Sequence, residues 1–120
     1  MKITSHYEQL ESYTTKDKSI IRELMHPAVQ GNRQQSLAEA IVAIDQETAL
    51  HKHITSEELY FLTQGEGLMS LGDECFVVQE GDTICIPAGT PHKIRNTGKN
   101  ELKILCCSAP AYAHDDTVLL

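Results

Sequence analysis

The sequence predicts an all-β protein, a sandwich or a barrel, and two observations lead to this fold class. Short runs rich in β-branched and aromatic residues recur along the chain, and turns with glycine, proline, asparagine or aspartate separate them. About eight strands of this kind are typical of sandwiches and barrels. A closed or double-sheet form also removes the exposed edges that so many strands would otherwise present.

The chain of 120 residues is predicted to form one domain. Tyr7, Leu10 and Tyr13 are large apolar side chains near the N-terminus, and their spacing is roughly helical. A short helix or an arm laid on a partner would both fit there, whereas the tail shows no period and suits a surface strap. We therefore predict an N-terminal arm or helix, a single barrel and a C-terminal strap, over residues 1–18, 19–110 and 111–120.

The first strand is predicted over residues 19–25, and it ends at His26-Pro27. A residue before proline is held extended, and proline cannot donate to a ladder of hydrogen bonds. The run 36–45 is ambiguous, because its first half has helix propensity whereas its second half is short and β-branched. We interpret this run as a strand, since turn-bounded β-rich runs follow it.

The clearest local pattern is a hairpin in the second half of the chain. Residues 68–71 and 74–78 flank Gly72-Asp73, and glycine followed by aspartate suits a two-residue hairpin turn. Similar β-rich runs bounded by turns predict the remaining strands, over residues 58–63, 83–86, 92–96 and 102–107.

Composition excludes several classes of protein. The hydrophobic content of 41% and charged content of 22% are ordinary for a globular protein, and no apolar run approaches the roughly 20 residues that span a bilayer. With a formal charge of −7 and no cluster of Lys and Arg, the chain would repel a phosphate backbone. The first residues lack the apolar core of a secretory signal. We therefore expect a cytoplasmic protein without nucleic-acid or membrane partners.

The four cysteines show no C-x-x-C spacing and lie in apolar, strand-like runs. We predict reduced, buried thiols with structural roles for all of them. Two are neighbours, and neighbours in a strand point to opposite faces, so this pair cannot serve one metal ion. The cysteines are Cys75, Cys85, Cys106 and Cys107.

Side chains with nitrogen and oxygen donors gather between residues 51 and 58. His51 and His53 are two apart, so on an extended backbone both rings leave the same face, roughly 6 to 7 Å apart at the backbone. Glu58 follows after a four-residue loop and begins a strand in which it shares a face with Tyr60. Glu57 is the competing carboxylate, but parity places it on the opposite face, so we favour Glu58.

A fourth candidate, His92, follows a bend that Pro87, Gly89 and Pro91 restrict. Four nitrogen and oxygen ligands would leave one or two exchangeable positions on an ion that prefers five or six. The pattern therefore predicts a metal site formed between two hairpins.

Two further side chains are open to more than one interpretation. Tyr60 could hydrogen-bond a substrate, or it could be a core tyrosine with its hydroxyl at the mouth of the barrel. Arg22 lies in an apolar strand, where a salt bridge to an acidic neighbour is favoured over a clamp for a substrate carboxylate or phosphate.

These spacings resemble the two motifs of the cupins. The first reads His51-x-His53-x4-Glu58-x6-Gly65, without the glycine that usually leads it, and the second reads Gly81-x5-Pro87-x-Gly89-x2-His92-x3-Asn96. The resemblance covers about the central third to half of the chain. It implies a double-stranded β-helix, the jelly-roll barrel of cupins, with a metal held by His51, His53, Glu58 and His92. The flanking segments are similar to small single-domain cupins that are loosely described as mannose-6-phosphate-isomerase-like.

Such a site predicts a metal-dependent enzyme that acts on a small organic substrate, of the oxygenase or the isomerase and lyase type. The ion could be Fe, Mn, Ni or Zn, because the ligand set does not choose among them. In isomerase or lyase chemistry, Glu58 or Tyr60 would move a proton. Activities frequent among cupins that keep four ligands favour an oxidoreductase slightly. The alternative is a module that binds or senses a small molecule, such as a sugar, without turnover.

The resemblance also suggests a homodimer. Either the first fifteen residues or the tail from Ala109 would be the arm that two copies exchange.

Overall fold

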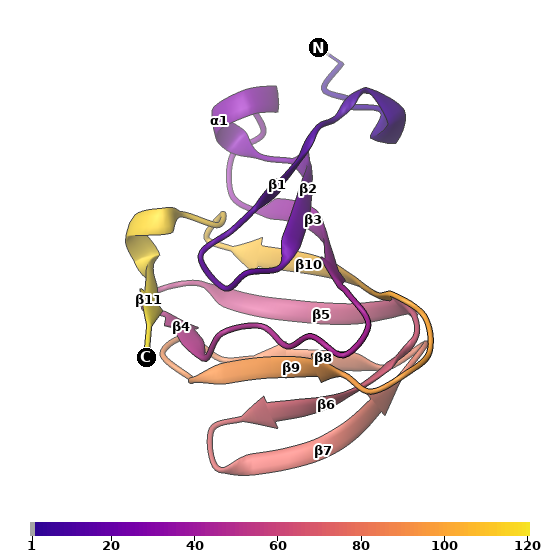
Figure 1. The fold of residues 1–120 in the computed structure, drawn as a ribbon. Coiled ribbons are helices and arrows are strands. Elements are labelled where there is room, and N and C mark those ends of the chain that lie inside the picture. Colours follow the sequence, from indigo (N-terminus) through magenta and orange to yellow (C-terminus); the bar gives the residue numbers. More distant parts are fainter. Residues whose placement is uncertain (1) are drawn as a thin grey trace.

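The computed structural model describes residues 2–120, so Met1, which begins the predicted arm, lies outside the described residues. Two antiparallel sheets face each other, with strand orders β1-β2-β3-β10-β5-β8 and β11-β4-β9-β6-β7 (Figure 1). This arrangement confirms the predicted all-β jelly roll. The strands are β1 Ser12–Thr14, β2 Ile20–Met25, β3 Ser36–Val42, β4 His51–His53, β5 Glu57–Gln64, β6 Glu66–Leu71, β7 Glu74–Gln79, β8 Thr83–Ile86, β9 His92–Asn96, β10 Leu102–Ala109 and β11 Thr117–Leu119.

The core lies between the sheets and follows from strand alternation. In β5, Glu58, Tyr60 and Leu62 are buried, whereas Leu59 and Phe61 on the opposite face are each 41% exposed. The same alternation runs through β3 and β10, which flank one another in the larger sheet. The main core residues are Ala40, Val42, Tyr60, Leu62, Met69, Val78, Ile84, Ile86, Ile94, Leu102, Ile104 and Cys106.

The hairpin between β6 and β7 forms as predicted. Leu71 pairs with Glu74, so Gly72 and Asp73 alone make the turn, and Gly72 has φ of +58°. A positive φ at the first central position is what a primed turn needs, and glycine adopts it without steric cost.

Both terminal segments pair with strands of their own chain. A single turn of 3₁₀ helix, η1 (Tyr7–Gln9), precedes β1, which pairs with β2 at the edge of the larger sheet. At the other end, η2 (His114–Asp116) leads into β11, which pairs with β4. Lys16 joins the two segments by donating to the carbonyls of His114 and Thr117. An exchange of either arm between two copies would have to break these pairings.

Several local expectations need correction. His26-Pro27 ends β2 as predicted, but Pro27–Gln30 then forms the one-turn helix α1, with the imidazole of His26 accepting from the Ala28 N–H. Proline is favoured at the first helical position because its missing N–H would have no partner there.

The expected salt bridge of Arg22 is absent among the described residues. Its guanidinium instead stacks 4.1 Å from the ring centroid of Tyr7 and donates to the Tyr7 carbonyl.

The prediction that all cysteines are buried is also wrong, because Cys75 and Cys85 are exposed on the outer faces of β7 and β8. The sequence alone does not show which face of each of these two strands points to the solvent. Within residues 2–120, no helix is long and apolar enough to cross a membrane.

Candidate metal centre

Three histidine side chains converge between β4 and β9. His51 and His53 lie on the inner face of β4, as their spacing predicts, and His51 pairs directly with His92 across the two strands. The ring centroids are 4.2 Å apart for His51 and His92, and 5.1 Å apart for His51 and His53. One nitrogen from each ring lies within 4.8 Å of the other two, and all three residues are buried. Atoms at these separations could bind one ion.

Backbone carbonyls fix the orientation of two of the rings. Nδ1 of His51 lies 2.8 Å from the Ala49 carbonyl, and Nδ1 of His92 lies 2.9 Å from the Thr90 carbonyl. A carbonyl oxygen only accepts, so each neutral ring carries its hydrogen on Nδ1. Nε2 of both rings therefore presents a lone pair, which is the form that binds a metal.

The ring of His53 is oriented by a hydroxyl from the C-terminal strand. Nδ1 of His53 lies 3.0 Å from Oγ1 of Thr117, and this hydroxyl donates to the Ala113 carbonyl at 3.0 Å. Because the hydroxyl hydrogen is used there, the oxygen accepts from Nδ1 of His53. Nε2 of His53 also presents a lone pair.

Glu58 brings a carboxylate to these nitrogens. Its Oε1 lies 3.2 Å from Nε2 of His53 and 3.5 Å from Nε2 of His92, while Ser108 donates to its Oε2 at 3.4 Å. Oε1 of Glu58 and Nε2 of His92 are both buried without a hydrogen-bond partner. Acceptors held together without a shared hydrogen repel one another, so the arrangement fits a cation between them.

The ionisation of these groups agrees with this fit. Burial raises the pKa of Glu58, but hydrogen bonds and positive charge from His53 and His92 outweigh it and lower the pKa to about 2. This lowering needs a proton on Nε2 or a cation in its place, because the lone pair of a neutral ring would raise the pKa of the carboxyl group instead. Burial, and then the charge of His92, lower the pKa of His51. At neutral pH the site therefore offers an ionised carboxylate and a neutral imidazole, as metal binding requires. Glu57, the competing carboxylate, points to solvent.

A second carboxylate, which the sequence pattern did not single out, faces the same histidines. Oδ2 of Asp17 lies 3.6 Å from Nε2 of His51, and the Asp17 side chain is 13% exposed. Asp17 belongs to the turn between β1 and β2, far from the two motifs in sequence. Only the folding of the N-terminal segment onto the barrel brings it here.

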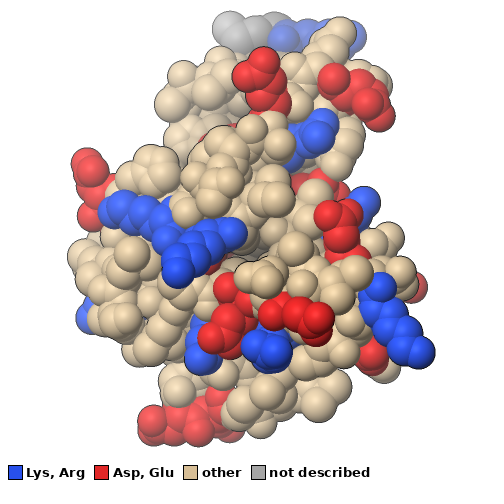
Figure 2. Space-filling view, viewed as in Figure 1, with Lys and Arg blue, Asp and Glu red and all other residues tan. Residues whose placement is uncertain are grey.

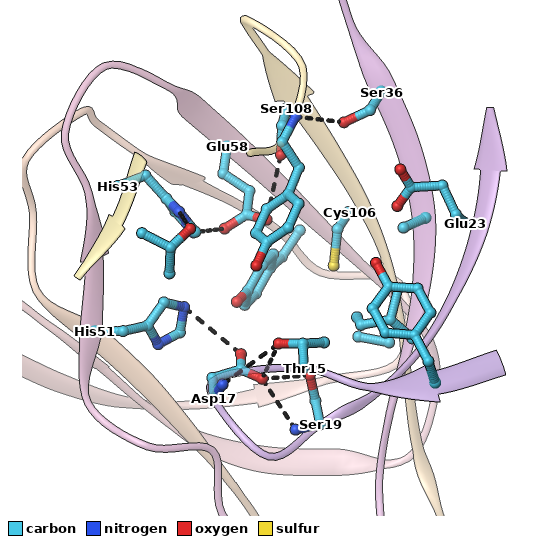
Figure 3. Close-up of a pocket in the computed structure, with 17 residues that line it drawn as sticks. Thr15, Asp17, Ser19, Glu23, Ser36, His51, His53, Glu58, Cys106 and Ser108 are labelled. Carbon is cyan, nitrogen blue, oxygen red and sulfur yellow. Dashed lines mark hydrogen bonds and ion pairs between the residues drawn. The ribbon is translucent and has the colours of Figure 1, made fainter. Parts of the chain in front are cut away.

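A cavity opens beside the candidate site, and residues of β1, β2 and the C-terminal segment form part of its walls (Figure 3). The space open to the centres of water molecules is about 40 Å³, which suits a few waters or a small polar group. Its walls carry many hydroxyls and three carboxylates, and no lysine or arginine among the described residues. The polar lining residues are Tyr13, Thr15, Asp17, Ser19, Glu23, Ser36, His51, His53, Glu58, Tyr60, Ser108, Tyr112 and Thr117.

Tyr60 lies in the cavity wall, next to the candidate site. Its ring centroid is 6.1 Å from that of His92, and the side chain is 5% exposed. Burial, with the charge of Glu58 next, raises the pKa of Tyr60 well above its usual value. The phenol therefore stays protonated and can act as a hydrogen-bond donor.

The motif residues around the site have structural contacts of their own. Gly89 adopts φ of +79°, and Asn96 is buried with its amide donating to the carbonyls of Val42 and Asn100. The family model of the cupin domain matches residues 39–108. The chain belongs to the cupin family. The matched segment contains both motifs and all four predicted ligands, whereas Asp17 and Thr117 lie outside it.

Known proteins resemble this cupin to different degrees. An uncharacterised protein of Methanocaldococcus jannaschii is 56% identical over 98% of this chain and 94% of its own. The Streptomyces protein Pac13, a nucleoside dehydratase solved with uridine, superposes with a TM-score of 0.80 at 16% identity, over 100% of this chain and 92% of its own. An oxalate decarboxylase of Lactobacillus farciminis, solved with formate, gives a TM-score of 0.81 at 21% identity, over 96% and 35%. The two solved structures show the shared fold.

Proposed function

We propose that this cupin is a metal-dependent enzyme that acts on a small organic substrate. One observation carries the proposal: three imidazole lone pairs and Oε1 of Glu58 converge beside a cavity, with no hydrogen to share. A single divalent transition metal ion fits this donor set, and Fe, Mn, Ni and Zn all accept three nitrogens and an oxygen. The residues that would hold it are His51, His53, Glu58 and His92.

Within this class we favour isomerase or lyase chemistry. A bound ion would supply Lewis-acid polarisation of a substrate oxygen. Glu58 would bind the ion through its ionised carboxylate, while the protonated hydroxyl of Tyr60 would donate a hydrogen bond to the substrate. A hydrogen-bond donor beside a Lewis acid suits the stabilisation of a developing oxyanion, which isomerase and lyase reactions require. Two neighbours in fold, the nucleoside dehydratase and the oxalate decarboxylase, have names of the same broad type.

The walls of the cavity favour a neutral substrate that carries hydroxyl groups. Asp17, Glu23 and Glu58 make the cavity acidic, and no lysine or arginine among the described residues lines it. A phosphate or a dicarboxylate would meet these charges without a cationic partner apart from the metal. Hydroxyl groups of a substrate could instead pair with the serine, threonine and tyrosine hydroxyls of the walls.

The experiment begins with metal analysis of the protein as isolated. Transition metal at less than about a tenth of an equivalent would contradict the proposal, because sites of this kind bind tightly. Protein loaded separately with Mn, Fe, Ni and Zn is then screened by NMR against small neutral polyols and hydroxy-aldehydes, each with its phosphorylated counterpart as a control. Turnover of neutral compounds, with less turnover of phosphorylated ones, is the expected result.

The same screen distinguishes an oxidoreductase. The iron-loaded protein is assayed in an oxygen electrode with each compound. If oxygen uptake depends on the substrate, the enzyme is a dioxygenase and the assignment as an isomerase or lyase is wrong.

A second candidate function is a module that binds or senses a small molecule without turnover. The small size of the cavity favours it. Calorimetry that shows metal-dependent binding of a compound, with no product by NMR, would support this candidate.

We also propose that the protein is a cytoplasmic homodimer without nucleic-acid partners. Leu37, Leu59 and Phe61 are each 37 to 41% exposed on the outer face of the larger sheet, and apolar faces of this kind are often covered by a partner. On the face that Figure 2 shows, acidic and basic side chains are interspersed, which gives nucleic acid no continuous basic patch. A monomer in sedimentation at micromolar concentration would count against the dimer.

A further inference from the structure

We propose that Asp17 is a fifth protein ligand of the metal centre, supplied by the turn between β1 and β2. The inference rests on the proposed metal site and extends it beyond the segment that matches the cupin domain, which begins at residue 39. In Figure 3 the Asp17 carboxylate lies directly opposite the ring of His51, on the far side of the site from Glu58.

Distances between donor atoms support this role. Adjacent ligands of one octahedral ion, each about 2.1 Å from it, lie about 3.0 Å apart. Oε1 of Glu58 lies 3.5 Å from Nε2 of His92, and Oδ2 of Asp17 lies 3.6 Å from Nε2 of His51. The distance between Asp17 and His51 is therefore almost the same as the distance between Glu58 and His92. Both pairs would close by about half an ångström around an ion. Both carboxylates would also move towards the remaining donors, because the donor atoms that lie within 4.8 Å of one another are those of the three histidines alone.

The hydrogen bonds of Asp17 leave one oxygen for the ion. Its Oδ1 accepts from the Ser19 N–H at 2.9 Å, from the Ser19 hydroxyl at 2.6 Å and from the Thr15 hydroxyl at 3.2 Å. Its Oδ2 has no hydrogen-bond partner among the described residues and lies at the cavity. A hydrogen bond to His51 is excluded, because 3.6 Å is too long and Nε2 carries no hydrogen in the tautomer that Ala49 imposes.

The backbone couples this turn to the adjacent histidine. The Ala49 N–H donates to the Asp17 carbonyl at 2.8 Å, and the Ala49 carbonyl lies 2.8 Å from Nδ1 of His51. One peptide segment thus fixes both the turn that carries the carboxylate and the ring that faces it. Side chains held in this way are pre-organised for a common ion.

A fifth ligand changes what the site can do. Two carboxylates would balance the charge of a divalent ion, so the loaded site would be neutral, and five protein ligands would leave a six-coordinate ion one position for a substrate atom. Such a centre would bind one oxygen of a neutral substrate and would select harder ions such as Mn(II) over softer ones.

The test compares Asp17→Asn with Glu23→Gln. Asparagine keeps an oxygen for the Ser19 N–H and replaces the second oxygen with an amide that cannot bind the ion. Glu23 lines the same cavity, but its carboxylate lies beside His26, so its variant controls for the general loss of negative charge. Metal-free protein is titrated with Mn(II), followed by electron paramagnetic resonance, and with Co(II), followed by its visible absorption.

We expect Asp17→Asn to weaken Mn(II) binding by at least about tenfold and to change the Co(II) spectrum, while Glu23→Gln stays within about twofold of wild type. Equal affinities for Asp17→Asn and wild type, or equal losses in both variants, would overturn the proposal. Wild-type protein that binds neither ion would overturn the proposed function as well, so the two failures differ. If Asp17→Asn does not fold, Asp17→Ser, which also keeps a turn oxygen, takes its place with the same expected loss.

Discussion

Nδ1 of His53 and Oγ1 of Thr117 lie 3.0 Å apart, although 64 residues separate them in the sequence. The contact joins a metal-ligand candidate on β4 to the C-terminal strand β11, which pairs with β4. It shows that the tail is part of the site, since the hydroxyl fixes the ring that would bind the ion.

Thr117→Val should weaken metal binding while the fold remains intact. Valine has the shape of threonine but cannot accept from Nδ1 of His53, and loss of such an outer contact typically costs about 10- to 100-fold in metal affinity. Competition with a chromophoric chelator measures the change. Thr117→Ser keeps the hydroxyl and should behave like wild type. Equal affinities of all three proteins would show that the contact does not orient the ligand.

His53→Ala should abolish metal loading without unfolding the protein, because the core is apolar and lies below the site. Inductively coupled plasma mass spectrometry after gel filtration measures the bound metal, and circular dichroism follows thermal unfolding. His114→Ala, which removes an exposed histidine, is the matched control. A His53→Ala protein that is unfolded at room temperature would indicate a structural site instead.

Glu58→Gln should separate the stability of the metal-free protein from its affinity for metal. The amide can donate to Nε2 of His53, where the carboxylate has no hydrogen to share, so the metal-free variant should be as stable as wild type or more stable by about 1 kcal/mol. Metal affinity should fall by about 100-fold, or roughly 3 kcal/mol. Differential scanning calorimetry with and without metal measures both effects. The exposed Glu57→Gln should change neither, and a destabilised metal-free Glu58→Gln would contradict the repulsion that we describe.

Asp116 should stabilise the protein in a pH-dependent manner. Its carboxylate accepts from the Thr55 N–H, the Thr55 hydroxyl and the Ser56 N–H, at 2.9, 2.8 and 3.1 Å. Burial raises the pKa of Asp116, but these hydrogen bonds outweigh it and lower the pKa below its usual value. Since the folded pKa lies below the unfolded one, the contribution is complete above about pH 4 and is lost as the pH falls through the folded pKa.

Urea denaturation of wild type and Asp116→Asn measures this contribution. The difference in unfolding free energy should be about 1 kcal/mol at pH 7 and should shrink below pH 4. The exposed Asp115→Asn serves as the control for charge alone. If the difference in unfolding free energy stays constant with pH, the negative charge of Asp116 does not stabilise its hydrogen bonds with Thr55 and Ser56.

Asn96→Ala should be among the more destabilising polar substitutions. Asn96 is 1% exposed, and its side chain donates to the carbonyls of Val42 and Asn100 and accepts from the Gly98 N–H. Alanine would leave these buried groups without partners, at a cost of about 2 to 4 kcal/mol. Asn96→Asp, which keeps only the acceptor, should cost about as much. A loss below 1 kcal/mol by urea denaturation would indicate that water replaces the amide.

The strand pattern could be predicted because it is local. Alternation in β5 placed Glu58 on the inner face, and the Gly72-Asp73 turn located the hairpin between β6 and β7. Local patterns failed where the outcome depends on which face or partner a residue meets. Arg22 thus stacks on Tyr7 instead of forming a salt bridge, and Cys75 and Cys85 face outward.

By itself the sequence determined the all-β class and a candidate site of three histidines and Glu58, because their spacing in extended strands sets which side chains share a face. Only the tertiary structure decided what surrounds that site. Asp17 and Thr117 reach the histidines because β1, β2 and β11 fold back onto the barrel, through pairings that no local spacing encodes. Contacts between residues so far apart in the sequence form only when the whole sheet packs. The roles of Asp17 and Thr117 can therefore be recognised only in the folded protein.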